Sequence, residues 1–360
     1  MTEVSAIGKQ TVLDNCNFAK SILMLCVVIG HSLAFWTGKW FSAMEPAYQC
    51  EWLGWVANYL GTFHIYAFTL ISGFIYYSLK CERGHYNDFK VFIAKKIKRL
   101  LIPYVFVSIV WVIPVGCYFY HYNLSDVFYN FALGSSPSQL WFLLMLFGVF
   151  FLFNSMYHFF IGHRLMALIA VVVLHLTGLV CLMTIAYNVF QVFTVFYYLI
   201  FFYLGYKISE HYNIFFRKRG ISLNKSSFLV LLFVVNIVAF VCYVFLSTAE
   251  SSTVISIIKK LIFEFLIFEG SVTSFAVLIK IGEKTSASKS KVIKLLNDNN
   301  FVMYLFHQQL IYICIYWLNG IASPEVNALA NFAFAFATSL VISLILHKIK
   351  FIRVLLGESR

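Results

Sequence analysis

The fold is decided by a stretch near the N-terminus, residues 13–36, which reads LDNCNFAKSILMLCVVIGHSLAFW. After Lys20 the stretch contains no Asp, Glu, Lys or Arg. A helix needs about 20 mostly apolar residues to cross the hydrocarbon core of a bilayer, and this stretch supplies them. It therefore predicts a membrane-spanning helix that carries one histidine, His31, inside the bilayer.

The rest of the chain has the same character, because 61% of its 360 residues are hydrophobic and only 12% are charged. Soluble domains carry about 25% charged residues. With half of that proportion, too little polar surface is available to cover a soluble body of this size. The composition excludes a soluble enzyme, a disordered protein and a disulfide-stapled scaffold, and it indicates a polytopic membrane protein.

Ten stretches are long and apolar enough, or nearly so, to be membrane spans. They are residues 17–36, 53–79, 100–120, 140–160, 165–183, 189–207, 227–247, 257–279, 301–319 and 328–347. We therefore predict an all-α, polytopic integral membrane protein with about ten transmembrane helices. No internal repeat or separate soluble domain is visible, so residues 1–360 are expected to form one transmembrane domain.

The basic residues indicate how the spans are oriented. The chain has 27 Lys and Arg against 15 Asp and Glu, a formal charge of +12. With the N-terminus inside and the loops assigned alternately, only Lys39, Lys259 and Lys260 fall outside. Because inner loops carry the excess of Lys and Arg, we predict that both termini are cytoplasmic, with short tails at about 1–15 and 348–360. The expected location is the plasma or inner membrane.

Neither nucleic-acid binding nor a metal site is predicted. The basic residues lie in short loops between apolar segments, and no nucleic-acid-binding motif is present. The eight cysteines form no CxxC or CxC pair, and no HExxH-like spacing occurs. A zinc site made by two histidines and a glutamate from different spans stays open as an alternative.

A few ionisable side chains fall within the predicted spans, where they are costly and are therefore candidates for function. They are His31, His64, His175, Glu264, Glu269 and His307. His31 lies about 16 Å beyond Lys20 along a helix, close to the midplane and on the same helix face. His64 and Glu269 are expected at a similar depth, and His307 about 10 Å in from Asn300. Three spans thus each bring one titratable side chain to a common layer.

Two histidines and a carboxylate in this layer suit proton transfer. A neutral imidazole is a good general base near neutral pH, and a carboxylate can orient it. No nucleophile motif such as GxSxG is present, so removal of a proton from a substrate hydroxyl fits better than acylation at Ser or Cys. A structural role is preferred for His175 and stays open for His64 and His307. Glu269 is preferred to Glu264 as the carboxylate of the site because it lies deeper in the predicted span.

Five short motifs, in this order along the chain, resemble those of the acyltransferase 3 family of integral membrane O-acyltransferases. The first is the pair Lys20 and His31, although Arg is common in the family at the basic position. The others are FHIYAFTLISGF at 63–74, KKIKRLLIPY at 95–104, LWFL at 140–143 and YLFH at 304–307. Within the second motif, Tyr66 or Ala67 replaces the Pro of the family.

The resemblance implies transfer of an acyl group, often acetyl, from acyl-CoA on the cytosolic side to a hydroxyl of a cell-surface carbohydrate or lipid-linked glycan. It makes His31 the catalytic residue and Lys20 its basic partner. Acetyl-CoA or another acyl-CoA is then a donor substrate, and no permanently bound cofactor is expected. The expected partners are this donor, the glycan acceptor and membrane lipids, and the oligomeric state is not predicted.

The predicted mechanism is that His31 removes a proton from the acceptor hydroxyl, which attacks the thioester. His64 is expected to orient the acceptor or to stabilise the oxyanion, and Glu269 is expected to supply the carboxylate. The predicted donor-binding residues are Lys95, Lys96, Lys98 and Arg99, although the simpler interpretation is that they only orient the spans. The predicted substrate-binding residues are His307 and Trp141.

Three alternatives stay open. The first is a transporter or flippase of a glycan or lipid-linked precursor, since polytopic folds with polar groups at the midplane often move substrates. The second is a membrane scaffold with no chemistry. The third concerns mechanism: in a two-step route, His31 is acylated transiently instead of acting only as a base.

Overall fold

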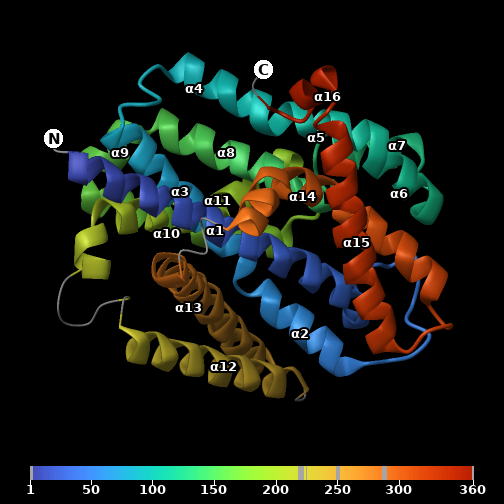
Figure 1. The fold of residues 1–360 in the computed structure, drawn as a ribbon. Coiled ribbons are helices and arrows are strands. Elements are labelled where there is room, and N and C mark those ends of the chain that lie inside the picture. Colours follow the sequence, from blue (N-terminus) through green and yellow to red (C-terminus); the bar gives the residue numbers. More distant parts are fainter. Residues whose placement is uncertain (1–2, 218–222, 224, 249–251, 286–289, 359–360) are drawn as a thin grey trace.

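The computed structural model describes residues 3–217, 223, 225–248, 252–285 and 290–358, and Figure 1 shows how their helices pack side by side in one bundle. No strand occurs among these residues. The helices are α1 (Glu3–Leu33), α2 (Glu51–Gly61), α3 (His64–Tyr77), α4 (Phe89–Lys96), α5 (Ile102–Val107), α6 (Ile113–Tyr120), α7 (Leu124–Val127), α8 (Trp141–Ser155), α9 (Tyr157–Gly162), α10 (Arg164–Thr184), α11 (Val192–Glu210), α12 (Ser226–Thr248), α13 (Thr253–Thr285), α14 (Lys291–Leu318), α15 (Pro324–Leu346) and α16 (Lys350–Leu355).

The prediction of an all-α polytopic membrane protein is confirmed. Within the described residues, nine helical runs are long and apolar enough to cross a membrane, and they correspond to nine of the ten predicted spans. The remaining span, predicted at 53–79, is divided into α2 and α3. The break is tight, because the N–H groups of Thr62 and Phe63 still bond to the carbonyls of Tyr59 and Leu60 at 3.0 and 3.3 Å.

The third span begins earlier than predicted. Its helical run covers Phe89–Tyr120 rather than 100–120, and it joins α4, α5 and α6 through two π-helical segments that precede Pro103 and Pro114. Asp88 caps the run, since its carboxylate accepts a hydrogen bond from the N–H of Val91 at 2.9 Å. Lysine is a good helix former, so residues 95–99 continue the helix instead of belonging to the loop before it.

The crossing of α3 and α11 depends on two glycines. A Cβ atom on Gly73 would collide with the backbone carbonyl of Phe202, and one on Gly205 would collide with that of Leu70. Small residues let helix backbones approach this closely in membranes. The crossing holds α3 in place, and α3 carries His64 at its N-terminal end.

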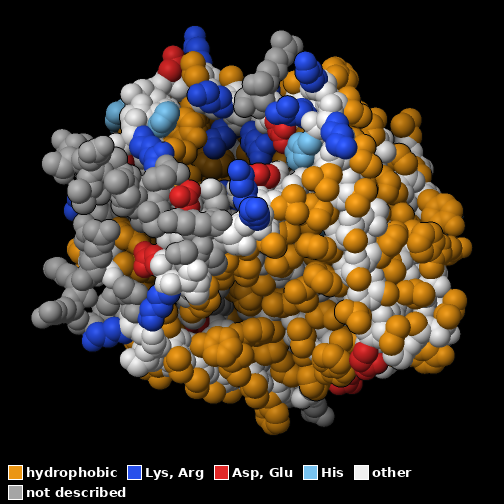
Figure 2. Space-filling view, in the orientation of Figure 1, with side chains coloured by type: hydrophobic (Ala, Val, Ile, Leu, Met, Phe, Trp, Pro, Cys, Tyr) orange, Lys and Arg blue, Asp and Glu red, His pale blue; other side chains and the backbone are white. Residues whose placement is uncertain are grey.

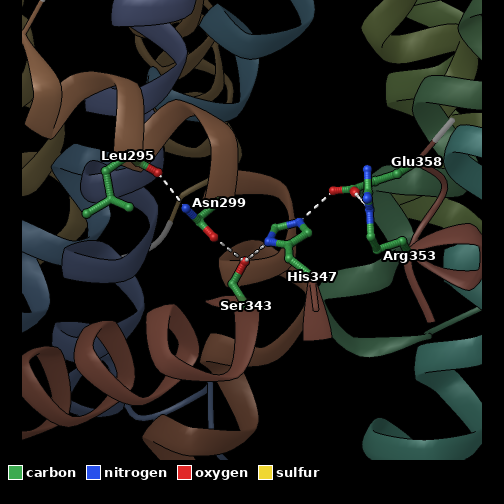
Figure 3. A network of polar contacts seen from close by, with 6 residues as sticks. All are labelled: Leu295, Asn299, Ser343, His347, Arg353 and Glu358. Carbon is green, nitrogen blue, oxygen red and sulfur yellow. Dashed lines mark hydrogen bonds and ion pairs between the residues drawn. The ribbon is translucent and has the colours of Figure 1, made fainter. Parts of the chain in front are cut away.

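The C-terminal segment is tied to α14 and α15 by a chain of polar contacts, drawn in Figure 3. Ser343 donates to Asn299 at 2.7 Å and meets Nδ1 of His347 at 3.3 Å, and Nε2 of His347 meets Glu358 at 2.5 Å. The single hydroxyl proton of Ser343 goes to the side-chain oxygen of Asn299. Arg353 adds a bond to the same carboxylate at 3.0 Å.

Candidate active site

The candidate site is built around two imidazoles. His31 lies in the last turn of α1 and His307 lies within α14, and Nδ1 of His31 is 2.8 Å from Nε2 of His307. The ring planes differ by 10° and the ring centroids are 5.0 Å apart. With so short a distance between the nitrogens, the rings lie edge to edge in nearly one plane. His307 is fully buried, whereas His31 is partly exposed.

A chain of hydrogen bonds fixes the protons of this pair. Nδ1 of His307 lies 2.8 Å from the carbonyl oxygen of Tyr304. A carbonyl only accepts, so Nδ1 of His307 donates and its Nε2 is left as an acceptor. Nδ1 of His31 must then donate to that nitrogen. In the neutral pair, Nε2 of His31 therefore carries a free lone pair, which is the state that a general base requires.

His64 joins this pair from α3. Its Nδ1 makes a short hydrogen bond to the carbonyl of Leu60, and its Cε1 lies 3.9 Å from the position of a Cβ on Gly30. Gly30 directly precedes His31, and His64 is close enough to interact electrostatically with both His31 and His307. The structure thus brings together three of the predicted site residues, from α1, α3 and α14.

A cavity of about 260 Å³ approaches the pair from one side, and three cations line it. They are Lys20 of α1, Lys96 of α4 and Arg99 of the π-helical segment Ile97–Leu101. Within the described residues, none of the three forms an ion pair with a carboxylate. Figure 2 shows Lys and Arg side chains around a hollow at the upper edge of the molecule, where α4 and α16 lie in Figure 1. The cations are suited to hold an anionic ligand.

The cavity ends one helical turn short of the histidines. Its wall includes Val27, which precedes His31 by four residues, and Tyr304, which precedes His307 by three. Side chains at these spacings lie on the same face of a helix. A ligand with its charged end at the cations would therefore extend its other end toward the histidine pair.

Only two of the four cations predicted at 95–99 face this cavity. Lys96 and Arg99 line it, and they lie over the rings of Phe150 at 3.6 Å and Phe301 at 4.4 Å. Lys95 is exposed, and neither it nor Lys98 is part of the lining. Residues three apart share a helix face. Lys96 and Arg99 therefore share the face toward the cavity, and Lys95 and Lys98 share another face.

Glu269 lies in a different environment from the histidine pair. Its carboxylate accepts short hydrogen bonds from Asn236 of α12 and from Thr273 one turn further along α13. Its neighbour Gly270 packs against Phe63, beside His64. The described structure shows no hydrogen bond from Glu269 to a histidine, and its catalytic role stays a prediction.

The other buried ionisable residues form a separate cluster. His175 of α10 bonds to the carbonyl of Tyr197 at 2.7 Å and lies 3.3 Å from the carboxylate of Glu264. The hydroxyl of Tyr197 donates to Glu264 at 3.0 Å, and Lys260 lies 3.4 Å from it. Trp141 packs against Tyr198, the neighbour of Tyr197, with ring centroids 5.7 Å apart. These contacts give His175 and Glu264 partners of their own, and the predicted role of Trp141 in substrate binding is not tested.

One residue at the site was not predicted from the sequence. The indole of Trp40 lies 5.2 Å from the imidazole of His31, inclined at 38° to it, and 4.9 Å from the ring of Tyr312. The sequence held a sign of this contact. Trp40 follows the first span closely, and a tight turn at Gly38 can direct the chain back toward the helix end that carries His31.

Comparison with known proteins adds one finding. A family model described as an acyltransferase domain matches residues 13–348 of the chain. No curated protein and no solved structure matches the chain.

Proposed function

Because the chain belongs to the acyltransferase 3 family, which matches nearly its whole length, we propose that this membrane acyltransferase moves an acyl group, acetyl by default, from acyl-CoA to a hydroxyl of a carbohydrate or lipid-linked glycan. The family is one of acyltransferases, which favours the enzyme over the transporter and the scaffold. The acyl-CoA donor, the glycan acceptor and the role of His31 are parts of the proposal.

The observation that carries the proposal is the position of the histidine pair one helical turn beyond the inner end of a cavity lined by cations. Nε2 of His31 has the free lone pair, and His307 holds the ring through the 2.8 Å bond to Nδ1. Nε2 takes the proton of the acceptor hydroxyl as its oxygen attacks the thioester carbonyl. The C–S bond then breaks and the CoA thiolate receives the proton from His31. A two-step route through acylated His31 uses the same lone pair.

The donor is assigned from the charges. Acyl-CoA carries phosphates at one end and the thioester at the other, and Lys20, Lys96 and Arg99 supply cations for the phosphates. Lys20 lies deepest along α1 and is the cation nearest the histidines in that helix. His64 is proposed to orient the acceptor or to stabilise the oxyanion, and His307 is proposed to position His31 rather than to bind substrate.

The proposed location follows from the same charges. Acyl-CoA is cytosolic, so the cavity with its cations is proposed to open to the cytoplasm. Both termini are then cytoplasmic, as the distribution of Lys and Arg predicts. The proposed membrane is the plasma or inner membrane, where cell-surface glycans and their lipid-linked precursors are accessible.

The proposal is tested with membranes from producing cells, incubated with radiolabelled acetyl-CoA, followed by counting of the label in the extracted carbohydrate. His31→Ala is expected to lower incorporation by at least about 10²-fold, the usual size of a general-base effect. His307→Gln keeps an oxygen that can accept from Nδ1 of His31, so it is expected to retain more activity than His307→Ala.

The matched control is Ser32→Ala, since the Ser32 hydroxyl only bonds to the Val28 carbonyl at 2.7 Å within its own helix. Ser32→Ala should keep wild-type incorporation. Full incorporation by folded His31→Ala refutes the base assignment. Label that never exceeds that of membranes lacking the protein refutes the assignment of donor and acceptor.

A further inference from the structure

The histidine pair has the cavity one helical turn away on one side and aromatic side chains on the other. On α14, Tyr304 lines the cavity, His307 follows it by one turn, and Tyr312 lies beyond His307. On α1, Val27 lines the cavity and His31 follows it by one turn, and Trp40 of the segment after the span packs its indole on both His31 and Tyr312. Because a helix rises steadily along its axis, Tyr312 lies on the side of the pair away from the cations, and Trp40 lies there too because it packs on Tyr312.

The segment that carries Trp40 is held in place from several directions. The N–H of Ala47 donates to the Asn319 side chain at 2.9 Å, and that side chain donates back to the carbonyl of Glu45 at 2.8 Å. The indole N–H of Trp36 donates to the carbonyl of Tyr48 at 3.2 Å. These bonds fasten the segment after α1 to the turn between α14 and α15, so the backbone that carries Trp40 is held in place.

The cover on this side of the pair, formed by Trp40, Phe41 and Tyr312, is aromatic throughout. The ring of Phe41 stacks on Tyr312 with ring centroids 4.3 Å apart and an interplanar angle of 9°, and Trp40 meets Tyr312 edge to face at 62°. Phe41 and Tyr312 are almost completely buried, and Trp40 is partly exposed. The indole of Trp40 occupies space beside the imidazole that water would otherwise fill. These rings also present flat faces of the kind that pack against the C–H surface of a sugar ring.

We propose that Trp40 determines whether the acyl group goes to the acceptor or to water. This inference rests on the proposed function. While no acceptor is bound, the indole of Trp40 closes the side of His31 away from the donor cavity and keeps water from Nε2. An acceptor carbohydrate displaces or packs against the indole and brings its hydroxyl to that nitrogen. Exclusion of water from an active site is a known way to prevent such side reactions.

The side reaction is simple to write. If water reaches His31, Nε2 takes a proton from it and the water oxygen forms a bond to the thioester carbonyl carbon. The C–S bond breaks, and the thiolate of CoA receives the proton from His31. The products are acetic acid and CoA, with no acceptor consumed. Loss of the cover should therefore raise this reaction relative to transfer.

The test uses purified full-length protein in detergent with labelled acetyl-CoA and no acceptor, and it measures acetate formed above the level of His31→Ala. Trp40→Ala is expected to raise this His31-dependent hydrolysis on the order of tenfold, because it opens a path for water. Trp40→Phe keeps an aromatic cover and should stay near the wild type. Tyr312→Leu removes the ring behind Trp40 and should act in the same direction as Trp40→Ala, which gives a second variant should Trp40→Ala fail to fold.

The matched control is Trp36→Phe, which loses the bond to Tyr48 and loosens the same segment but leaves Trp40 over His31. It should hydrolyse no faster than the wild type. If the wild type labels carbohydrate in membranes but neither Trp40→Ala nor Tyr312→Leu hydrolyses faster than it, the role of Trp40 is refuted. Equal hydrolysis by Trp36→Phe and Trp40→Ala would also refute it, because general loosening then explains the effect. If the wild type labels no carbohydrate, the proposed function itself is refuted.

Discussion

Lys95 and Lys96 are adjacent in the sequence, but only Lys96 lies in the wall of the cavity that leads to His31. This pair offers a clean test of donor binding. Lys96→Ala is expected to weaken acetyl-CoA binding by about ten- to a hundred-fold, since a hydrogen bond to a charged group contributes about 1.5–3 kcal/mol. Lys95→Ala removes an equal charge from an exposed position. The measurement is the Kd of acetyl-CoA by calorimetry on the purified protein at fixed salt.

An equal loss of acetyl-CoA affinity in Lys96→Ala and Lys95→Ala would contradict the assignment of Lys96 to donor binding. In that case the cations would act only through the net charge of this face. A loss confined to Lys96→Ala, with circular dichroism unchanged in both proteins, supports direct contact with the donor.

At the level of single residues, the sequence identified the ionisable side chains within the spans but not which of them lie together. Counting residues along the helices placed His31, His64 and Glu269 in one layer and His307 nearer the cytoplasm. In the structure, His307 bonds to His31, whereas Glu269 bonds to Asn236 and Thr273. Residue counting gives height along a helix, but the direction in which a side chain points depends on which helices are neighbours. That information is absent from a single sequence.

Among the helices, the crossing of α3 and α11 is the contact most sensitive to an added atom. Gly73→Ala is expected to lower the free energy of unfolding by about 1–3 kcal/mol or more, because the new Cβ meets the carbonyl of Phe202 and the backbone cannot yield easily. The shift of α3 should also lower activity, since His64 begins that helix. Thermal unfolding in detergent measures the first effect.

The matched control for this prediction is Gly61→Ala. A Cβ at Gly61, in the last position of α2, meets no atom within 4 Å. Alanine also favours a helix more than glycine does, so Gly61→Ala should keep the melting temperature of the wild type. Equal melting temperatures for Gly73→Ala and the wild type would show that the two helices do not depend on this contact.

The elements themselves were well predicted where hydrophobicity alone decides them. The ten apolar stretches all became helical, because a backbone in hydrocarbon must satisfy its own hydrogen bonds. The two departures have local causes. The break at Thr62 and Phe63 lies within an apolar stretch without proline, so composition gives no sign of it. The early start of the third span was signalled by Asp88, a good N-cap residue, but the lysines that follow concealed it.

For the molecule as a whole, the orientation in the membrane is open to a direct measurement. Cys81 is exposed and lies between the second and third spans, on the side predicted to be cytoplasmic. In a chain without other cysteines, Cys81 should react with a membrane-impermeant maleimide only after the cells are permeabilised. Ala43→Cys, in the segment after α1, should react in intact cells. The reverse pattern would place the cations and the donor cavity outside the cell and would contradict an acyl-CoA donor.

The polar chain around His347 and Glu358 shows that the end of the protein is part of this assembly. Glu358 binds both His347 and Arg353 and also interacts electrostatically with Arg99 of the cavity. Gly357 lies against the backbone of Lys98 and Arg99, where a Cβ would be 2.8 Å from the Lys98 carbonyl. The C-terminal segment therefore braces the helix that supplies two of the three cations, something that no local sequence pattern indicates.

The bond between His31 and His307 joins residues that are 276 positions apart. A ribosome therefore completes the first helix long before the partner of its histidine has been made. Until α14 enters the membrane, a nascent chain has His31 without the imidazole that orients it, and the wall of the cavity formed by Tyr304 is also missing. Under the proposed mechanism, a chain that is still being synthesised, or one cut short before α14, is expected to be inert toward cellular thioesters until the last helices have been inserted.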